Sequence, residues 1–232
     1  MNPQELTKQL QSIYNDNLES VILYGSAADG EFHKGISDYN MIVVLKEISP
    51  NELAKSNKAI KKWSKGGHPL PMIFTVQIIK DAADVFPIEF FDIIERRKIL
   101  YGLDPFLDIK IDGKNLRHQC EHELRSKLLG LHPRIALLAG KPKDLQRLIL
   151  ESSSSFFALF RGILRLAGAK PKELKKELLA QLSKLINFNP NIFLEIIEVR
   201  EGGRIWRESE VLEKFEQYLT SLDAVVKFAD KF

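Results

Sequence analysis

The sequence predicts an α+β domain built on a mixed sheet over residues 1–113, followed by an all-α helical bundle over residues 114–232. A chain of 232 residues can form one large core or two modest ones, because domains usually contain roughly 100–200 residues. In the first half, short runs rich in β-branched residues alternate with helical segments. After about residue 115, the apolar residues recur every three or four positions. This change of pattern predicts a domain boundary near residue 113.

The first elements of the N-terminal half are predicted from capping residues and from β-branched runs. Asn2, Pro3 and Glu5 match an N-cap, a first-turn proline and a capping-box acid, so a helix begins here. The runs SVILY (20–24) and NMIVVL (40–45) are bounded by turn residues and predict two strands. The chain therefore passes from a helix into a strand, through a long turn, and into a second strand.

Further helices and strands complete the first half. Ser49, Pro50 and Glu52 repeat the capping pattern and predict a helix that continues to about Lys62. The apolar run MIFTVQII (72–79) predicts a third strand, with alternate side chains on opposite faces. The remaining predictions are a helix through residues 88–97, a strand at 98–102 and an edge strand at 107–113.

The second half is predicted to be helical throughout. Apolar residues from Leu116 to Leu138 recur at spacings of three or four, which predicts a long helix that Gly140 and Pro142 interrupt. The later helices are predicted at residues 145–163, 172–186, 190–199 and 211–226. Several helices with apolar faces and short connections are typical of a bundle.

The serine run 152–155 admits two interpretations. Apolar residues keep helical spacing across the run, which favours a face of small residues where another helix approaches closely. The alternative is a phosphate-binding serine loop, but the run lacks the glycines that such a loop needs.

Composition and charge favour an ordinary globular protein of the cytoplasm. The sequence is 44% apolar and 28% charged, and its formal charge of +3 is too small to indicate a nucleic-acid partner. No apolar run approaches the roughly 20 residues that cross a bilayer, and Met1-Asn2-Pro3 opens no signal peptide. Cys120 is the only cysteine, so it forms no intramolecular disulfide, and no Cys/His cluster suggests zinc. We therefore expect a cytoplasmic protein without a membrane partner.

The stretch LYGSAADGEFHKGISDYN (23–40) combines residues that can bind phosphate and a metal ion. A glycine after a strand lets backbone N–H groups approach a polyphosphate, and the hydroxyl of Ser26 beside Gly25 can bond a phosphate oxygen. Asp38, at the start of the next strand, could hold Mg²⁺, which prefers oxygen ligands and commonly bridges a carboxylate and substrate phosphates. Residues i and i+2 on a strand face the same way, so Asp38 and Asn40 project together while the intervening tyrosine points behind.

The whole pattern GSAADG…SDYN resembles the nucleotidyltransferase superfamily, which has the polymerase-β-like fold. In that family a Gly-Ser, often extended as Gly-Ser-x-Ala-Arg-Gly, precedes Ser-Asp-x-Asp or Ser-Asp-x-Glu on the following strand. The residues that match are Gly25, Ser26, Gly30, Ser37 and Asp38. A mixed α/β domain followed by a helical bundle is also similar to aminoglycoside nucleotidyltransferases and their small toxin–antitoxin relatives. The resemblance covers residues 20–45 clearly and the rest of the first hundred loosely.

This resemblance implies a nucleotide and a metal ion as ligands. Gly25, Ser26 and Ser37 would contact the triphosphate of a nucleotide. Asp38 would ligate Mg²⁺ and act as the catalytic carboxylate, and Asn40 occupies the position of a second metal ligand.

Three departures from the family pattern make the metal site incomplete. Asn40 replaces the second carboxylate, and an asparagine oxygen can ligate a cation but adds no charge. Asp29 replaces the usual arginine, which places a negative charge beside the expected phosphates. The third carboxylate of active relatives lies on a later strand. The side chains available on or just beyond the predicted strand are those of Thr75, Gln77, Asp81 and Asp84.

The leading hypothesis is a nucleotidyltransferase-fold protein that binds a nucleoside triphosphate with Mg²⁺ weakly and transfers a nucleotide slowly or not at all. Two-metal phosphoryl transfer depends on carboxylates that neutralise the ions. One alternative is an active enzyme that moves AMP to a hydroxyl of a small molecule or a protein, with an acid from the bundle; Glu121, Glu123 and Glu151 are the candidates. Another is a non-catalytic module that interacts with a protein partner or a second copy of the chain. The sequence leaves open whether the protein is an enzyme.

Overall fold

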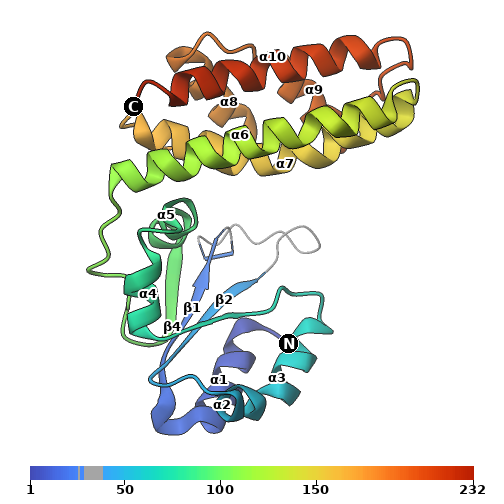
Figure 1. Ribbon diagram of the computed structural model, residues 1–232. Helices are drawn as coiled ribbons and strands as arrows, with labels where there is room; N and C mark the ends of the chain where they lie inside the picture. Colours follow the sequence, from blue (N-terminus) through green and yellow to red (C-terminus); the bar gives the residue numbers. More distant parts are fainter. Residues whose placement is uncertain (26, 29–38) are drawn as a thin grey trace. The chain divides into compact units, whose positions relative to one another are not determined.

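The computed structural model of the chain describes residues 1–25, 27–28 and 39–232, which form two compact units, Met1–Asp112 and Gly113–Phe232 (Figure 1). The elements of the first unit are α1 (Pro3–Tyr14), the 3-10 helix η1 (Asn15–Asn17), β1 (Leu18–Tyr24), β2 (Asn40–Leu45), α2 (Pro50–Lys55), α3 (Asn57–Ser64), β3 (Met72–Phe74), α4 (Val76–Ala82), α5 (Pro87–Glu95) and β4 (Arg97–Gly102). Those of the second unit are α6 (Gly113–Leu138), α7 (Pro142–Leu166), α8 (Lys175–Leu185), α9 (Asn191–Arg200) and α10 (Val211–Ala229). An α+β region followed by a helical region confirms the predicted fold class.

In the described part of the first unit, a four-stranded sheet has the order β3-β2-β1-β4. β1 pairs antiparallel with both β2 and β4, and β2 pairs parallel with β3, so the sheet is mixed. The predicted strands at 20–24, 40–45 and 98–102 are confirmed. Tyr24 at the end of β1 lies opposite Asn40 at the start of β2, so these two residues share one edge of the sheet.

Alternating side chains of β1 and β2 fill two cores, one on each face of the sheet. Val21 and Leu23 belong to a cluster with Leu6 and Leu10 of α1 and Trp63 of α3. The cluster on the other face includes Ile22, Ile42, Ile79, Phe90 and Ile93, from β1, β2, α4 and α5. Each fully buried side chain of this size contributes about 1.5–3 kcal/mol. Burial on both faces explains why the two central strands are nearly continuous apolar runs.

The predicted strand over residues 72–79 is wrong after its first three residues. β3 ends at Phe74, and Thr75 is the N-cap of α4, where its Oγ1 accepts a hydrogen bond from the backbone N–H of Ile78 at 3.1 Å. Threonine favours this position because the bond satisfies an N–H that the first helical turn leaves without a partner. Gln77 lies within α4, so neither Thr75 nor Gln77 occupies a sheet position.

The predicted edge strand at residues 107–113 is also wrong. The chain there forms a turn, in which the N–H of Ile109 donates to the carbonyl oxygen of Phe106 at 3.2 Å. Phe106 is buried and packs edge-on against Phe90, with ring centroids 5.7 Å apart. Burial of this one ring against α5 therefore fixes the segment without a place in the sheet.

The helix predicted from Ser49 to about Lys62 is divided into α2 and α3 at Ser56. Ser56 is buried, and its hydroxyl donates a hydrogen bond to the carbonyl oxygen of Leu53 at 3.1 Å. A serine side chain that bonds to a nearby carbonyl competes with the regular helical hydrogen bonds, which explains the interruption.

The helices of the second unit pack around aromatic side chains. Phe160 of α7 lies 5.1 Å from Phe193 of α9, and Phe193 lies 5.3 Å from Tyr218 of α10, measured between ring centroids. All three side chains are fully buried. Aromatic pairs of this kind contribute about 0.5–1.5 kcal/mol beyond their buried area. No helix in the described part of the chain has the length and apolarity needed to cross a membrane.

The serine run 152–155 lies inside α7, so the serine-loop interpretation is wrong. Ser153 is fully buried, and the hydroxyl of Ser152 lies 3.0 Å from the hydroxyl of Tyr218 on α10. Ser154 accepts a hydrogen bond from Arg200 of α9. Small side chains on this face therefore let neighbouring helices approach α7 closely, as the spacing predicts.

Candidate site at the Gly25–Asn40 edge of the sheet

Gly25 follows the last residue of β1 in a left-handed backbone conformation, with φ of +78°. Its N–H donates a hydrogen bond to the carbonyl oxygen of Arg96 at 2.9 Å, and its carbonyl oxygen accepts one from the N–H of Ala28 at 2.9 Å. Residues that carry a Cβ rarely adopt this conformation, whereas glycine adopts it at no steric cost. The local backbone thus explains why a glycine stands at the start of the motif.

The side-chain amide of Asn40 lies directly over Gly25. A Cβ atom placed on Gly25 would lie 3.3 Å from Nδ2 of Asn40, which is a tight contact. A larger residue at position 25 would push the amide away. Two of the predicted site residues, one after β1 and one at the start of β2, are therefore brought together at the same edge.

Tyr39 packs on the opposite side of β2 from Asn40. Its ring lies 5.0 Å from that of His68 and 6.3 Å from that of Trp63, measured between centroids. Trp63 is fully buried, and its indole N–H donates to the carbonyl oxygen of Pro69 at 2.7 Å. These aromatic contacts fix the face of the sheet to which the side chain of Tyr39 points. Because successive side chains point to opposite faces, the side chain of Asn40 points to the other face.

The other predicted site residues lie outside the described residues. These are Ser26, Asp29, Gly30, Ser37 and Asp38. Their roles toward a nucleotide and Mg²⁺ stay predictions.

The short apolar strand β3 (Met72–Phe74) carries no acid to place beside Asn40. Asp81, an acid expected just beyond the strand, lies on α4, where Oδ1 accepts a hydrogen bond from the side chain of Gln77 at 2.7 Å. Asp84 lies in the turn after α4. β3 itself therefore does not supply the third carboxylate that the family pattern requires.

Asp92 on α5 is an acid near this edge that the motif does not reveal. Burial raises the pKa of Tyr24, and the negative charge of Asp92 raises it further. Tyr24 is the register partner of Asn40. Asp92 lies one helical turn after the buried Ile88 on α5, and its place relative to Tyr24 depends on how α5 crosses the sheet, which sequence spacing does not reveal.

Arg97 is a cation near the same edge, since it pairs with Tyr24 across β1 and β4. Its guanidinium donates to Asp104 at 2.7 and 2.9 Å, and it also donates to the carbonyl oxygen of Ile94. Only 17% of the Arg97 side chain is exposed. An ion pair with several hydrogen bonds and little exposure has a well-defined geometry. The hydrogen bonds of the Arg97 guanidinium are therefore directed to protein groups.

Two of the glutamates proposed from the helical bundle form ion pairs within their own helix. Glu121 pairs with Arg117 at 2.8 Å and with Arg125 at 3.2 Å, and Glu123 pairs with Lys127 at 3.4 Å. These contacts give both carboxylates local partners on α6.

The described residues do not by themselves form a metal site. No group of three or more His, Cys, Asp or Glu side chains among them could hold a metal ion. Asn40 offers one neutral oxygen as a ligand. The amide oxygen of Asn40 suits one ligand of a hard cation.

Comparison with known proteins finds similarity at the level of structure. No family model and no curated protein matches the sequence. The chain is similar to the spectinomycin adenyltransferase AAD(9) from Enterococcus faecialis with ATP and spectinomycin, with 14% identity, a TM-score of 0.49, and coverage of 99% of this chain and 100% of that chain. It is also similar to a toxin-antitoxin with AMP-PNP, with 16% identity, a TM-score of 0.31, and coverage of 44% of this chain and 76% of that chain.

Proposed function

We propose that residues 1–113 form a nucleotidyltransferase-like domain that binds a nucleoside triphosphate at the Gly25–Asn40 edge, and that residues 114–232 form its helical-bundle partner domain. Mg²⁺ is held weakly, and nucleotidyl transfer is slow or absent. The observation that supports this proposal is the position of the Asn40 amide beside the glycine turn, where Nδ2 would lie 3.3 Å from a Cβ atom placed on Gly25. This position would bring the proposed phosphate-binding and metal-binding halves of the motif together at one edge of the sheet.

The weak metal affinity follows from the charge of the donor set. Asp38 and Asn40 would hold Mg²⁺, which when bound neutralises phosphate charge. Asn40 contributes an oxygen without charge, and Asp29 adds a negative charge near the expected phosphates. The single carboxylate of Asp38 would therefore supply the negative charge that three carboxylates supply to the metal ions in active members of the family.

Calorimetric titration of ATP, with and without Mg²⁺, tests the proposal. Asp38→Ala should abolish the metal-dependent part of ATP binding. Asn40→Asp should tighten Mg²⁺ or Mn²⁺ binding about tenfold, because a charged oxygen replaces a neutral one. Asp16→Ala, an exposed acid of η1, is the matched control and should change neither quantity. Equal metal affinity in wild type, Asp38→Ala and Asn40→Asp would show that this edge is not a metal site.

The position of Asp92 favours a second candidate function, an active enzyme that moves AMP to a hydroxyl group. An acid close to Tyr24, the register partner of Asn40, would replace the carboxylate missing from β3. Pyrophosphate released from ATP in the presence of a hydroxyl acceptor measures this activity. Loss of a measurable rate in Asp92→Asn, with ATP affinity retained, would favour the active enzyme; no release from wild type with any acceptor would favour the first function.

A further inference from the structure

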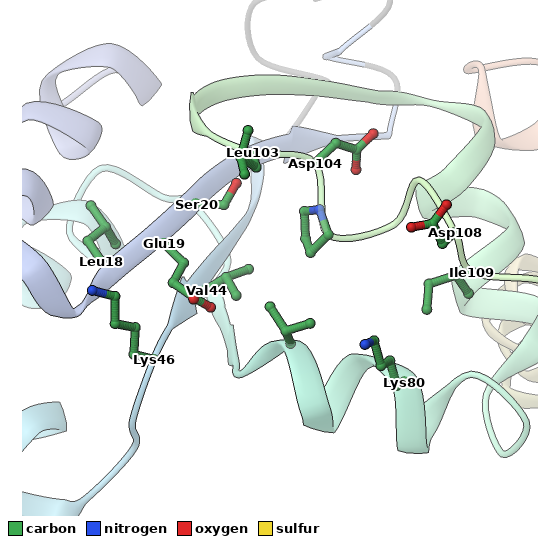
Figure 2. Close-up of a pocket in the computed structure, with 12 residues that line it drawn as sticks. Leu18, Glu19, Ser20, Val44, Lys46, Lys80, Leu103, Asp104, Asp108 and Ile109 are labelled. Atoms are coloured by element: carbon green, nitrogen blue, oxygen red, sulfur yellow. The ribbon is translucent and has the colours of Figure 1, made fainter.

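A cavity lies in the first unit, at the end of the sheet opposite Gly25 and Asn40. It is bordered by the start of β1 at Leu18 and by the end of β2 at Val44, and its volume is about 500 Å³ (Figure 2). Pockets that bind small molecules usually occupy about 300–1,000 Å³ and have mostly apolar walls with a few polar groups. The apolar part of this wall is formed by Leu18, Val44, Val76, Leu103, Pro105 and Ile109.

Two of the polar lining residues are already engaged in the fold. Asp104 accepts hydrogen bonds from the guanidinium of Arg97 at 2.7 and 2.9 Å and from the N–H of Phe106 at 3.0 Å. The hydroxyl of Ser20 donates to the carbonyl oxygen of Tyr101 at 3.0 Å. The bonds to Asp104 thus tie the loop after β4 to β4 itself, and the bond of Ser20 joins β1 to β4.

Four other charged side chains line the cavity, two of each sign. They are Glu19, Lys46, Lys80 and Asp108. Among the residues that the structure describes, none of the four takes part in an ion pair. A ligand of one charge would be attracted by two of them and repelled by the other two. A ligand that carries both charges can pair with one of each.

Glu19 and Lys80 are the pair best placed to orient such a ligand. Figure 2 shows Glu19 on β1 and Lys80 on α4, on separate walls with the cavity between them. Glu19 is partly buried, which strengthens its attraction for a cation. Lys80 follows Val76 by one turn of α4, so its stem and Val76 share one side of the helix. The separation of the charges leaves the apolar wall between them.

We infer that this cavity binds an elongated zwitterion, a small molecule with an apolar body, an ammonium group at one end and a carboxylate at the other. The ammonium lies against Glu19 and the carboxylate against Lys80. The body lies on the apolar wall that includes Val76 and Pro105. The site is separate from the proposed nucleotide site, because it borders the start of β1 whereas Gly25 follows its end.

Three matched probes test the charge pattern on the full-length protein by calorimetry and ligand-observed NMR: 8-aminooctanoate, octanoate and octylamine. The first should bind about tenfold more tightly than either of the others, since each lacks one charged hydrogen bond. Lys80→Met, which keeps an apolar stem, should weaken binding of 8-aminooctanoate and octanoate about tenfold and should not weaken binding of octylamine, because it removes a like charge. Glu19→Gln should weaken binding of 8-aminooctanoate and octylamine and should not weaken binding of octanoate, for the same reason.

Controls separate this pattern from general effects on the protein. Lys58→Met on α3 and Glu216→Gln on α10 change exposed charges elsewhere and should affect none of the three probes. Val76→Phe fills the cavity and should reduce binding of all three, with thermal unfolding as the check of its fold. Asp38→Ala should leave all three affinities unchanged, so failure of the nucleotide proposal and failure of this one are distinguishable. No binding of any probe, or equal effects of Lys80→Met and Glu19→Gln on all three, would overturn the inference.

Discussion

The two ends of the sheet in the first unit differ in how their residues come together. At one end, the motif residue Gly25 adopts a left-handed conformation after β1, and Nδ2 of Asn40 would lie 3.3 Å from a Cβ atom placed on it. At the other end, a cavity of about 500 Å³ is built from segments far apart in the chain, such as Leu18 and Ile109. The first site can be predicted from a local sequence motif, whereas the cavity is formed by the packing of segments that are distant in the sequence. The motif and the cavity are therefore independent indicators of function in this fold.

Glycines at the two ends allow this comparison to be tested directly. Gly102 and Gly25 both have positive φ, +75° and +78°. Gly102 pairs with Ser20 at the start of β1, and a Cβ atom on it would lie only 1.8 Å from the carbonyl oxygen of Glu19. The close approach at Gly102 involves backbone, which cannot move aside, whereas Gly25 approaches a side chain, which can.

Gly102→Ala is expected to have the largest effect on stability. A left-handed alanine costs about 1–2 kcal/mol, and separating β4 from β1 to remove the overlap adds about 1–3 kcal/mol. The free energy of unfolding in urea should therefore fall by about 2–5 kcal/mol. Gly67→Ala is the matched control, because Gly67 also has positive φ, +84°, but no atom within 4 Å of an added Cβ. Equal losses in the two variants would show that β4 does not approach β1 as described.

Gly25→Ala should cost less stability but should also affect ligand binding. The left-handed conformation costs about 1–2 kcal/mol, as in Gly67→Ala, and the amide of Asn40 can rotate away from the added methyl group. That rotation displaces a proposed metal ligand, so Mg²⁺-dependent ATP binding should weaken in Gly25→Ala and not in Gly67→Ala. Calorimetry on both variants checks this difference. Unchanged ATP binding in Gly25→Ala would show that the Gly25 turn is not part of the nucleotide site.

Much of the fold could be predicted from local patterns, and the errors have local causes too. The β-branched runs at 20–24 and 40–45 gave the central strands, because a strand buried on both faces needs such residues. The run at 72–79 alternates like a strand, but Thr75 as an N-cap ends it after three residues. Apolar alternation alone does not distinguish a long strand from a short strand and a capped helix.

The candidate site could be predicted only in part. The sequence motif predicts Gly25 and Asn40 as site residues, and their proximity follows from the antiparallel pairing of β1 with β2. The approach of Asp92 to Tyr24 depends on how α5 crosses the sheet, and one sequence does not fix the crossing of a helix over strands far away in the chain. The same holds for the opposite cavity, whose walls are distant in sequence.

Ser26→Ala is expected to have a moderate effect on nucleotide affinity. By its position in the motif, the hydroxyl bonds a phosphate oxygen, and one neutral hydrogen bond contributes about 1 kcal/mol. The Kd for Mg²⁺-ATP should therefore rise about fivefold. Ser12→Ala, an exposed serine of α1, is the control and should leave the Kd unchanged. An equal Kd in Ser26→Ala and wild type would remove Ser26 from the proposed site.

The smallest expected effect concerns the ionisation of Tyr24, and it tests whether Asp92 belongs to this edge of the sheet. Burial raises the pKa of Tyr24 above its ordinary value of 10.0, and Asp92 raises it further. The folded protein holds this proton more tightly than the unfolded chain, so the stability it contributes is present below pH 10.0 and is lost as the pH rises through the folded value.

Asp92→Asn removes a negative neighbour, so the pKa of Tyr24 should fall, although burial keeps it above the ordinary value. Ultraviolet absorbance titration of the phenolate measures this shift, with Tyr24→Phe to assign the signal and Asp16→Asn as the matched control. In both proteins the alkaline loss of stability begins as the tyrosine of the unfolded chain titrates near pH 10.0. The loss should be smaller and complete at lower pH in Asp92→Asn than in wild type, because the folded-state pKa of Tyr24 then lies closer to that of the unfolded chain. If Asp92→Asn and Asp16→Asn titrate identically, Asp92 does not lie beside Tyr24. The sheet edge would then have no acid from α5, and the active-enzyme alternative would lose the residue on which it depends.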